Sequence, residues 1–116
     1  MIPTKHFGNE AEEFVKNYLV QNKFSILALN YRQKIGEIDI IASKDDICIF
    51  VEVKARASGQ FLHQAISHSK QEKIKLTARY FLHEQRIRDK NCRFDVALLA
   101  GKNPDWQLTY IANAFY

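Results

Sequence analysis

The chain has 116 residues, of which 47% are hydrophobic and 26% are charged, a balance typical of a soluble globular protein rather than a disordered one. This length allows a single core, so we expect one domain over residues 1–116. Lys and Arg number 17 against 13 Asp and Glu, a formal net charge of +4 that weakly favours polyanionic partners such as nucleic acid. No apolar segment reaches membrane-spanning length and the first residues do not form a signal peptide, so we expect a cytoplasmic protein without a membrane partner.

The two cysteines, Cys48 and Cys92, each lie in an apolar, strand-like run, far apart in the sequence. The chain has no C-x-x-C spacing, and its histidines are not spaced as zinc ligands. We therefore expect buried free thiols in a reducing compartment and no zinc site.

The first predicted element is a helix from Phe7 to about Asn22, because apolar residues recur along it at steps of three and four. At 100° per residue, Glu10 lies about 60° from Phe7 at the edge of the apolar stripe, and Glu12 and Glu13 lie farther round. All three carboxylates also suit the positive end of a helix dipole. The periodicity predicts that Glu10 is the carboxylate nearest the sheet.

Apolar runs separated by polar turns predict five strands and a second helix. We expect the strands at Phe24–Arg32, Gly36–Ala42, Ile47–Lys54, Cys92–Ala100 and Trp106–Ile111. Ser69-Lys70-Gln71-Glu72 matches a capping box, in which the Ser and Glu side chains bind the free amides of a helix start, and it predicts a helix from Lys70 to about Glu84. A short helical turn is expected at Phe61–Ile66. The order α-β-β-β-α-β-β, with helices on both sides of a mixed central sheet, predicts a three-layer α/β domain.

Strand alternation brings charged side chains together in the hairpin of Gly36–Ala42 and Ile47–Lys54. The expected faces of the first strand are Glu37, Asp39 and Ile41 on one side and Ile38 and Ile40 on the other. The hairpin can place Asp39 beside Glu52 and Lys54, opposite an aliphatic layer. These charges cost desolvation energy unless they pair or bind something, and a divalent cation would remove the repulsion between the carboxylates. A ladder of salt bridges on a half-open sheet explains the same spacing, so the pattern leaves both hypotheses open.

Asp39, followed on the adjacent strand by Glu52-Val53-Lys54, resembles the D…ExK core of the PD-(D/E)XK nuclease superfamily, which includes restriction endonucleases and archaeal Holliday-junction resolvases. More closely, the chain resembles the YraN-like family of small predicted endonucleases. The matching segments run nearly from end to end: Gly8–Ala11, Asn30–Arg32, Gly36–Asp39, Phe50–Lys54, Lys70, Lys73-Ile74, Arg93–Val96 and Asn113–Phe115. Ile38 stands where the superfamily nominally has proline, a departure shared by many relatives with a G-x-I-D form.

The resemblance implies a restriction-endonuclease-like fold and a metal-dependent endonuclease that hydrolyses DNA phosphodiester bonds, with a resolvase-like role in repair or recombination. Asp39, Glu52 and the carbonyl of Val53 would hold Mg²⁺ or Mn²⁺ through oxygen ligands. Glu10 would lie beside the metal, directly or through water. Lys54 would orient the attacking water and neutralise the pentavalent phosphorus. The catalytic set implied is thus Asp39, Glu52 and Lys54.

Arg56 and Lys70 are the candidates for contact with nucleic acid. Arg56 lies in a predicted loop at 55–60; it keeps the face of Lys54 if the strand continues, and a solvated arginine explains it equally well. Lys70, at the exposed start of its helix, could reach nucleic acid above the carboxylates. Asp95 is expected to be structural, paired with Arg93 or with Arg32.

Two alternative functions stay open. A binding module with the same fold and metal site but little or no turnover would serve as an accessory in DNA repair or uptake, with salt-sensitive affinity and no cleavage. An interaction protein with a purely structural acidic cluster would show neither metal stabilisation nor specific nucleic-acid affinity. Resolvases act as dimers, so a homodimer is also open, although no long apolar stripe demands an interface.

Overall fold

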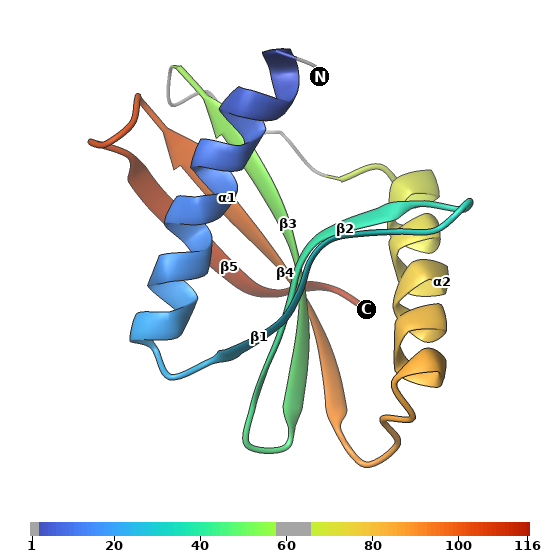
Figure 1. Cartoon of the computed structure of the whole chain (residues 1–116). Helices are drawn as coiled ribbons and strands as arrows, with labels where there is room; N and C mark the ends of the chain where they lie inside the picture. The colour runs from blue at the N-terminus through green and yellow to red at the C-terminus, as the bar shows by residue number, and fades with distance from the viewer. Residues whose placement is uncertain (1–2, 58–65) are drawn as a thin grey trace.

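A five-stranded sheet lies at the centre of the molecule, with one helix on each face (Figure 1). The structure, a computed structural model, describes residues 3–57 and 66–116, with side chains from residue 10 onward in the first segment. The elements are α1 (Pro3–Gln21), β1 (Ser25–Arg32), β2 (Glu37–Lys44), β3 (Ile47–Arg56), α2 (His68–Glu84), β4 (Asn91–Ala100) and β5 (Gln107–Phe115). The predicted order is confirmed. The helical turn predicted at Phe61–Ile66 lies outside the described residues except for its last position.

The strands pair in chain order, β1-β2-β3-β4-β5. Neighbours are antiparallel except β3 and β4, which run parallel because α2 carries the chain back between them. The β3–β4 register is unbroken from Ile47↔Asn91 to Arg56↔Ala100. Alternate residues of β3 therefore keep strictly to opposite faces of the sheet.

Each helix buries its apolar face against a different side of the sheet. Val15 of α1 packs in a cluster with Ile49 and Val51 of β3. Phe81 of α2 packs on the other side in a cluster with Phe50, at ring centroids 6.5 Å apart. Burying one such side chain contributes about 1.5–3 kcal/mol, and these two apolar layers hold the predicted three-layer arrangement together.

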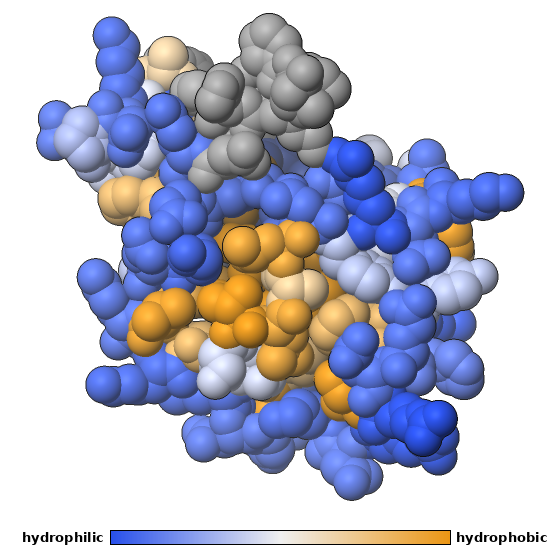
Figure 2. Space-filling view, in the orientation of Figure 1, coloured by the Kyte–Doolittle hydropathy of each residue, from blue (hydrophilic) through white to orange (hydrophobic). Residues whose placement is uncertain are grey.

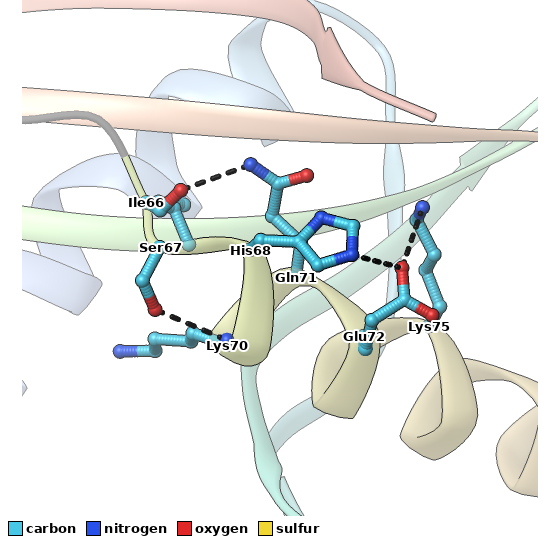
Figure 3. A network of polar contacts seen from close by, with 7 residues as sticks. All are labelled: Ile66, Ser67, His68, Lys70, Gln71, Glu72 and Lys75. Carbon is cyan, nitrogen blue, oxygen red and sulfur yellow. Dashed lines mark hydrogen bonds and ion pairs between the residues drawn. The ribbon is translucent and has the colours of Figure 1, made fainter.

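Helix α2 begins earlier than its predicted capping box. Its N-cap is Ser67, whose hydroxyl accepts a hydrogen bond from the Lys70 amide at 3.1 Å (Figure 3). The capping box predicted from Ser69 is wrong, because Ser67 has the extended backbone that a cap requires and supplies the same hydroxyl two residues upstream. The Glu72 carboxylate instead binds the Lys75 ammonium at 3.2 Å.

The cysteines differ in their surroundings. Both are free, but Cys48 is buried and Cys92 is exposed. The prediction of two buried thiols is therefore wrong for Cys92, because the first residues of β4 lie beyond the covered part of the sheet; its burial begins farther along the strand.

The surface between the two helices carries an apolar area over β1 and β2, surrounded by hydrophilic residues (Figure 2). β1 is an edge strand of the sheet, and its Leu27 and Leu29 are 41% and 45% exposed.

Among the described residues, no helix is both long enough and apolar enough to cross a membrane.

Candidate active site

Strands β2 and β3 part at Asp39. Their pairing ends at Ile40↔Val51. Beyond that point, Oδ2 of Asp39 accepts a hydrogen bond from the Val53 amide at 2.8 Å, where a carbonyl of a neighbouring strand would otherwise be the acceptor. The start of β2 then lies toward α2, while β3 continues along β4 (Figure 1). We call this opening, from Asp39 on one side to Glu52 and Val53 on the other, the fork.

The fork breaks the alternation predicted for β2. Ile38 packs with Phe50 on the α2 side of the sheet, whereas Ile40 packs with Val51 on the α1 side. The prediction that Ile38 and Ile40 share a face is therefore wrong. The physical reason is that Asp39 points toward a backbone amide in the plane of the sheet, so its carboxylate lies between the two faces.

Glu52 and Lys54 project from β3 on the side of α2, the same face as Phe50. Glu52 is only 8% exposed, and its Oε2 accepts a hydrogen bond from Nζ of Lys70 at 2.7 Å. Within the described part of the chain, Lys54 forms no ion pair with Glu52 or Asp39. The ammonium that reaches the carboxylates is that of Lys70.

Asp39 and Glu52 lie close enough to repel each other. Burial and the negative charge of Glu52 raise the pKa of Asp39 from 3.8 to about 8, although the hydrogen bond from Val53 opposes this change. The charges of Glu12 and Glu37 raise the pKa of Asp39 further. Asp39 therefore keeps its proton to a higher pH than an isolated aspartate does, and a nearby positive charge would oppose this change.

Lys70 remains a cation in this partly buried position. Burial alone would lower its pKa, but the hydrogen bond to Glu52 and the charges of Glu52, Asp39 and Glu37 raise it above the ordinary value. Its side chain leaves the first turn of α2 on the side away from Glu72 (Figure 3). Lys70 is thus the counter-ion of the fork.

A pocket of about 340 Å³ opens beside Lys70, between the residues that lead into β2 and the first turns of α2. The side chains of Ser67 and Lys73 also line it. Gly36 permits the close approach of its two walls: a Cβ at this position would lie 3.1 Å from Oγ1 of Thr77 and 3.3 Å from Cβ of Lys73. Hydroxyl and ammonium groups and the Glu37 carboxylate thus share this pocket, and Lys70 connects it to Glu52.

Helix α1 directs Glu12, rather than Glu10, toward the fork. Glu10 is exposed, whereas Glu12 is partly buried and its charge acts on Asp39. Val15 is fully buried at the centre of the helix stripe, and at 100° per residue Glu12 lies about 60° from it and Glu10 about 140°. The prediction that Glu10 lies nearest the sheet is therefore wrong. It measured angles around the helix from Phe7, whose side chain is outside the described ones; angles measured from Val15 would have selected Glu12.

Arg56 is the last residue of β3, not part of a loop as predicted. Its Nη1 donates a hydrogen bond to the Ala55 carbonyl at 3.2 Å, and its side chain is exposed. It follows Glu52 by four residues, which corresponds to about 13 Å along a strand. The structure therefore does not bring Arg56 to the carboxylates.

Asp95 is a structural hub, as predicted. It is fully buried and accepts hydrogen bonds from Nε and Nη2 of Arg93 at 2.9 and 3.0 Å, from the Tyr110 hydroxyl at 2.6 Å and from the Asn113 amide at 2.9 Å. Of its two predicted partners, Arg93 is confirmed, whereas Arg32 instead forms an ion pair with Glu37 of β2. Asp95 thus fastens β5 to β4 and offers no carboxylate to the fork.

The donor set of the fork fits a hard divalent cation that keeps part of its water shell. Asp39 and Glu52 would supply carboxylate oxygens and Val53 a strand carbonyl. In the portion of the chain described by the structure, no group of three or more His, Cys, Asp or Glu side chains is placed to hold a metal. Mg²⁺ commonly binds through one or two carboxylates and retains several waters. A cation would also offset the repulsion that raises the pKa of Asp39.

Comparison with known proteins finds relatives along almost the whole chain. A model of the uncharacterised protein family UPF0102 matches residues 11–99, a span that includes the fork and Lys70. A UPF0102 protein of Desulforapulum autotrophicum is 39% identical over 115 residues, covering 96% of this chain and 93% of the relative. One from Nitrosomonas europaea is 41% identical over 112 residues, with 93% and 92% covered. One from Dictyoglomus thermophilum is 37% identical over 117 residues, with 96% and 98% covered.

Proposed function

The chain belongs to the uncharacterised protein family UPF0102, a name that states no activity, and we propose that it is a metal-dependent endonuclease that hydrolyses DNA phosphodiester bonds. The observation that supports this most directly is the juxtaposition of Asp39 and Glu52 in a partly buried fork. Two carboxylates held together raise the free energy of the fold, and strongly shifted pKa values of this kind cluster at functional sites. The excess of 17 Lys and Arg over 13 Asp and Glu favours a polyanionic substrate.

The residues of the fork would divide the work as follows. Asp39, Glu52 and the Val53 carbonyl would hold Mg²⁺ or Mn²⁺, which when bound lowers the pKa of an attacking water and stabilises charge on the phosphate. Lys54, on the same face as Glu52, would orient that water and neutralise the phosphate. Of the α1 carboxylates, Glu12 would lie beside the metal, directly or through water, in place of Glu10, because its charge is the one that acts on Asp39. A resolvase-like role in repair or recombination follows from the same chemistry when the substrate is branched DNA.

A cleavage assay on labelled duplex, single-stranded and four-way-junction DNA, with Mg²⁺, Mn²⁺ or EDTA, tests this proposal. We expect metal-dependent cleavage that is lost in Asp39→Asn and Lys54→Gln. Asn is chosen at position 39 because its amide oxygen can still accept the Val53 hydrogen bond. Asp46→Asn, which neutralises an exposed carboxylate in the β2–β3 turn, is the matched control and should retain activity. Absence of cleavage by folded wild type on every substrate, or cleavage that survives in Asp39→Asn, would refute the enzyme.

A second candidate is a nucleic-acid-binding accessory protein with little or no turnover. The arrangement of the lysines favours it. The nuclease needs Lys54 beside the carboxylates to orient the attacking water, but the ammonium that binds Glu52 is that of Lys70. This candidate predicts DNA affinity that falls steeply with salt, without metal-dependent cleavage. Arg56→Gln and Lys70→Gln should each weaken that affinity if these residues contact phosphates. Fluorescence anisotropy at several salt concentrations, on the same variants, separates the two functions.

A further inference from the structure

The ion pair between Lys70 and Glu52 differs from the other ion pairs among the described residues. It joins a helix, α2, to a strand of the sheet, β3, whereas the others lie within one element or between neighbouring strands. The Glu52 side chain is only 10% exposed, while that of Lys70 is 48% exposed. The ammonium therefore closes the solvent side of a carboxylate that is otherwise enclosed by protein. Among the carboxylates, Glu52 is also the one whose charge acts most strongly on Asp39, so Lys70 neutralises one member of the carboxylate pair.

We propose that Lys70 is an intramolecular stand-in for the divalent cation: it neutralises Glu52 in the metal-free protein and leaves this carboxylate when the ion binds. The inference rests on the proposed function, because it requires that Asp39 and Glu52 be ligands of the ion. An ammonium and a divalent ion on the same carboxylate repel each other. Binding of the ion must therefore either displace Lys70 or overcome that repulsion.

Lys70 has both the freedom and the space to move. A lysine side chain is a flexible four-carbon stem that ends in a compact charge, and Lys70 itself lines the pocket of about 340 Å³ beside the fork. The Ser67 and Ser69 side chains and Lys73 line the same pocket. Glu37 also lines this pocket, and its charge already acts on Lys70. An ammonium released from Glu52 would meet this carboxylate there, together with the negative backbone of a bound nucleic acid. Metal binding would in this way add a positive charge to the DNA-binding surface, and the two ligands would favour each other.

Titration of Mn²⁺ into the full-length protein without nucleic acid tests the stand-in, with isothermal calorimetry as the readout. We expect Lys70→Gln to bind Mn²⁺ more tightly than wild type by on the order of tenfold, the size of a moderate coupling between two sites. Lys70→Arg keeps the competing charge and should bind as wild type does. Lys73→Gln removes a lysine from the same helix and pocket without an ion pair to Glu52, so it should change the affinity by less than about threefold.

Stability of the metal-free protein gives a second readout. In EDTA, Lys70→Gln leaves Glu52 without its counter-ion and should lower the urea midpoint more than Lys73→Gln does; added Mn²⁺ should reverse this order. An unchanged or weaker Mn²⁺ affinity in Lys70→Gln overturns the stand-in.

The outcomes separate the stand-in from the proposed function. If wild type binds Mn²⁺ through Asp39 but Lys70→Gln gains nothing, the stand-in is wrong and the metal centre stands. If neither protein binds Mn²⁺, the metal centre itself is wrong and the stand-in falls with it. If Lys70→Gln binds more tightly and neither protein cleaves DNA, the stand-in is supported and the nuclease is not.

Discussion

Oδ2 of Asp39 accepts a hydrogen bond from the Val53 amide at 2.8 Å, across the point at which β2 and β3 stop pairing. The Asp39 side chain thus accepts a hydrogen bond from β3 where the backbone pairing between β2 and β3 has ended. The same carboxylate is held beside Glu52, which raises its pKa. Asp39 therefore has a structural task and an electrostatic cost at one position, and the two can be measured separately.

Asp39→Ala and Asp39→Asn should differ in stability by about 1 kcal/mol, the net value of one intramolecular hydrogen bond. Both variants remove the charge, but only Asn retains an oxygen that can accept from Val53. Urea denaturation in EDTA at pH 8 measures the difference. Equal midpoints for the two variants would contradict the structural task assigned to this side chain.

The stability of the metal-free protein should fall as pH rises from about 4 to about 8. The pKa of Asp39 is raised from 3.8 to about 8 in the folded protein, so over this range the folded state binds its proton and the unfolded state does not. Stability falls with pH wherever the folded state binds more protons; this contribution is thus full below pH 4 and lost as pH rises through 8. Urea midpoints between pH 5 and pH 8 should decline more steeply for wild type than for Asp39→Asn, and parallel profiles would contradict this assignment.

Asp95→Asn should destabilise the protein by about 2 kcal/mol, because it removes the charge of a buried carboxylate that accepts four hydrogen bonds, while the Arg93 side chain left behind is 28% exposed and partly solvated. Tyr110→Phe, which removes one of the hydrogen bonds to Asp95, should cost about 1 kcal/mol. Thermal or urea unfolding measures both. Mn²⁺ affinity of the folded variants should stay at the wild-type value, whereas a loss in Asp95→Asn would place this carboxylate in the metal centre.

Ser67→Ala should lower stability by about 1 kcal/mol, because the Ser67 hydroxyl caps the start of α2. Ser69→Ala is the matched control, because Ser69 lies two residues farther along the chain and does not form that bond; this variant should stay within about 0.5 kcal/mol of wild type. Circular dichroism during urea unfolding follows both variants. The opposite ranking would restore the capping box at Ser69.

Native protein should react rapidly with a thiol reagent at a single position. Cys92 is exposed, whereas Cys48 is buried. Burial raises the pKa of both thiols, that of Cys48, with a smaller effect of Cys92, to about 11. The thiolate is the reactive form, so access to the reagent is what distinguishes Cys92. Labelling with a chromogenic disulfide at pH 8 should show one fast thiol in the native protein and two in guanidinium. Cys92→Ser should abolish the fast phase; two fast thiols in the native wild type would contradict the burial of Cys48.

The element order was predictable because each strand and helix here carries its own periodic pattern and turn residues. The neighbourhood of Asp39 and Glu52 was predictable for a related reason, since a two-strand hairpin limits which side chains can meet. Alternation failed where tertiary contacts override it. Ile38 packs in the cluster on the α2 side of the sheet and Ile40 in the cluster on the α1 side. Where the two strands separate thus depends on the packing of both helices.

Two other predictions could not be made correctly from the sequence: which carboxylate of α1 faces the sheet, and which group Lys70 binds. Glu10 and Glu12 differ by a rotation of α1 about its axis, which the sheet fixes through Val15. The pairing of Lys70 with Glu52 joins residues 18 positions apart, across a segment that no local pattern relates to the sheet. The expectation that Lys70 lies above the carboxylates identified its region, but local sequence could not tell a phosphate ligand from a carboxylate counter-ion.

Because Asp39 has a structural task as well as a proposed catalytic one, its presence in relatives of this protein must be interpreted with both in mind. A relative without the proposed nuclease chemistry would still need an acceptor for the Val53 amide, so selection for folding alone would retain Asp or Asn at this position. The persistence of an aspartate there is therefore poor proof of catalysis in a relative. The more informative position is Glu52, whose carboxylate is bound in the structure by the Lys70 side chain: an inactive lineage could exchange both for an apolar pair without opening the sheet.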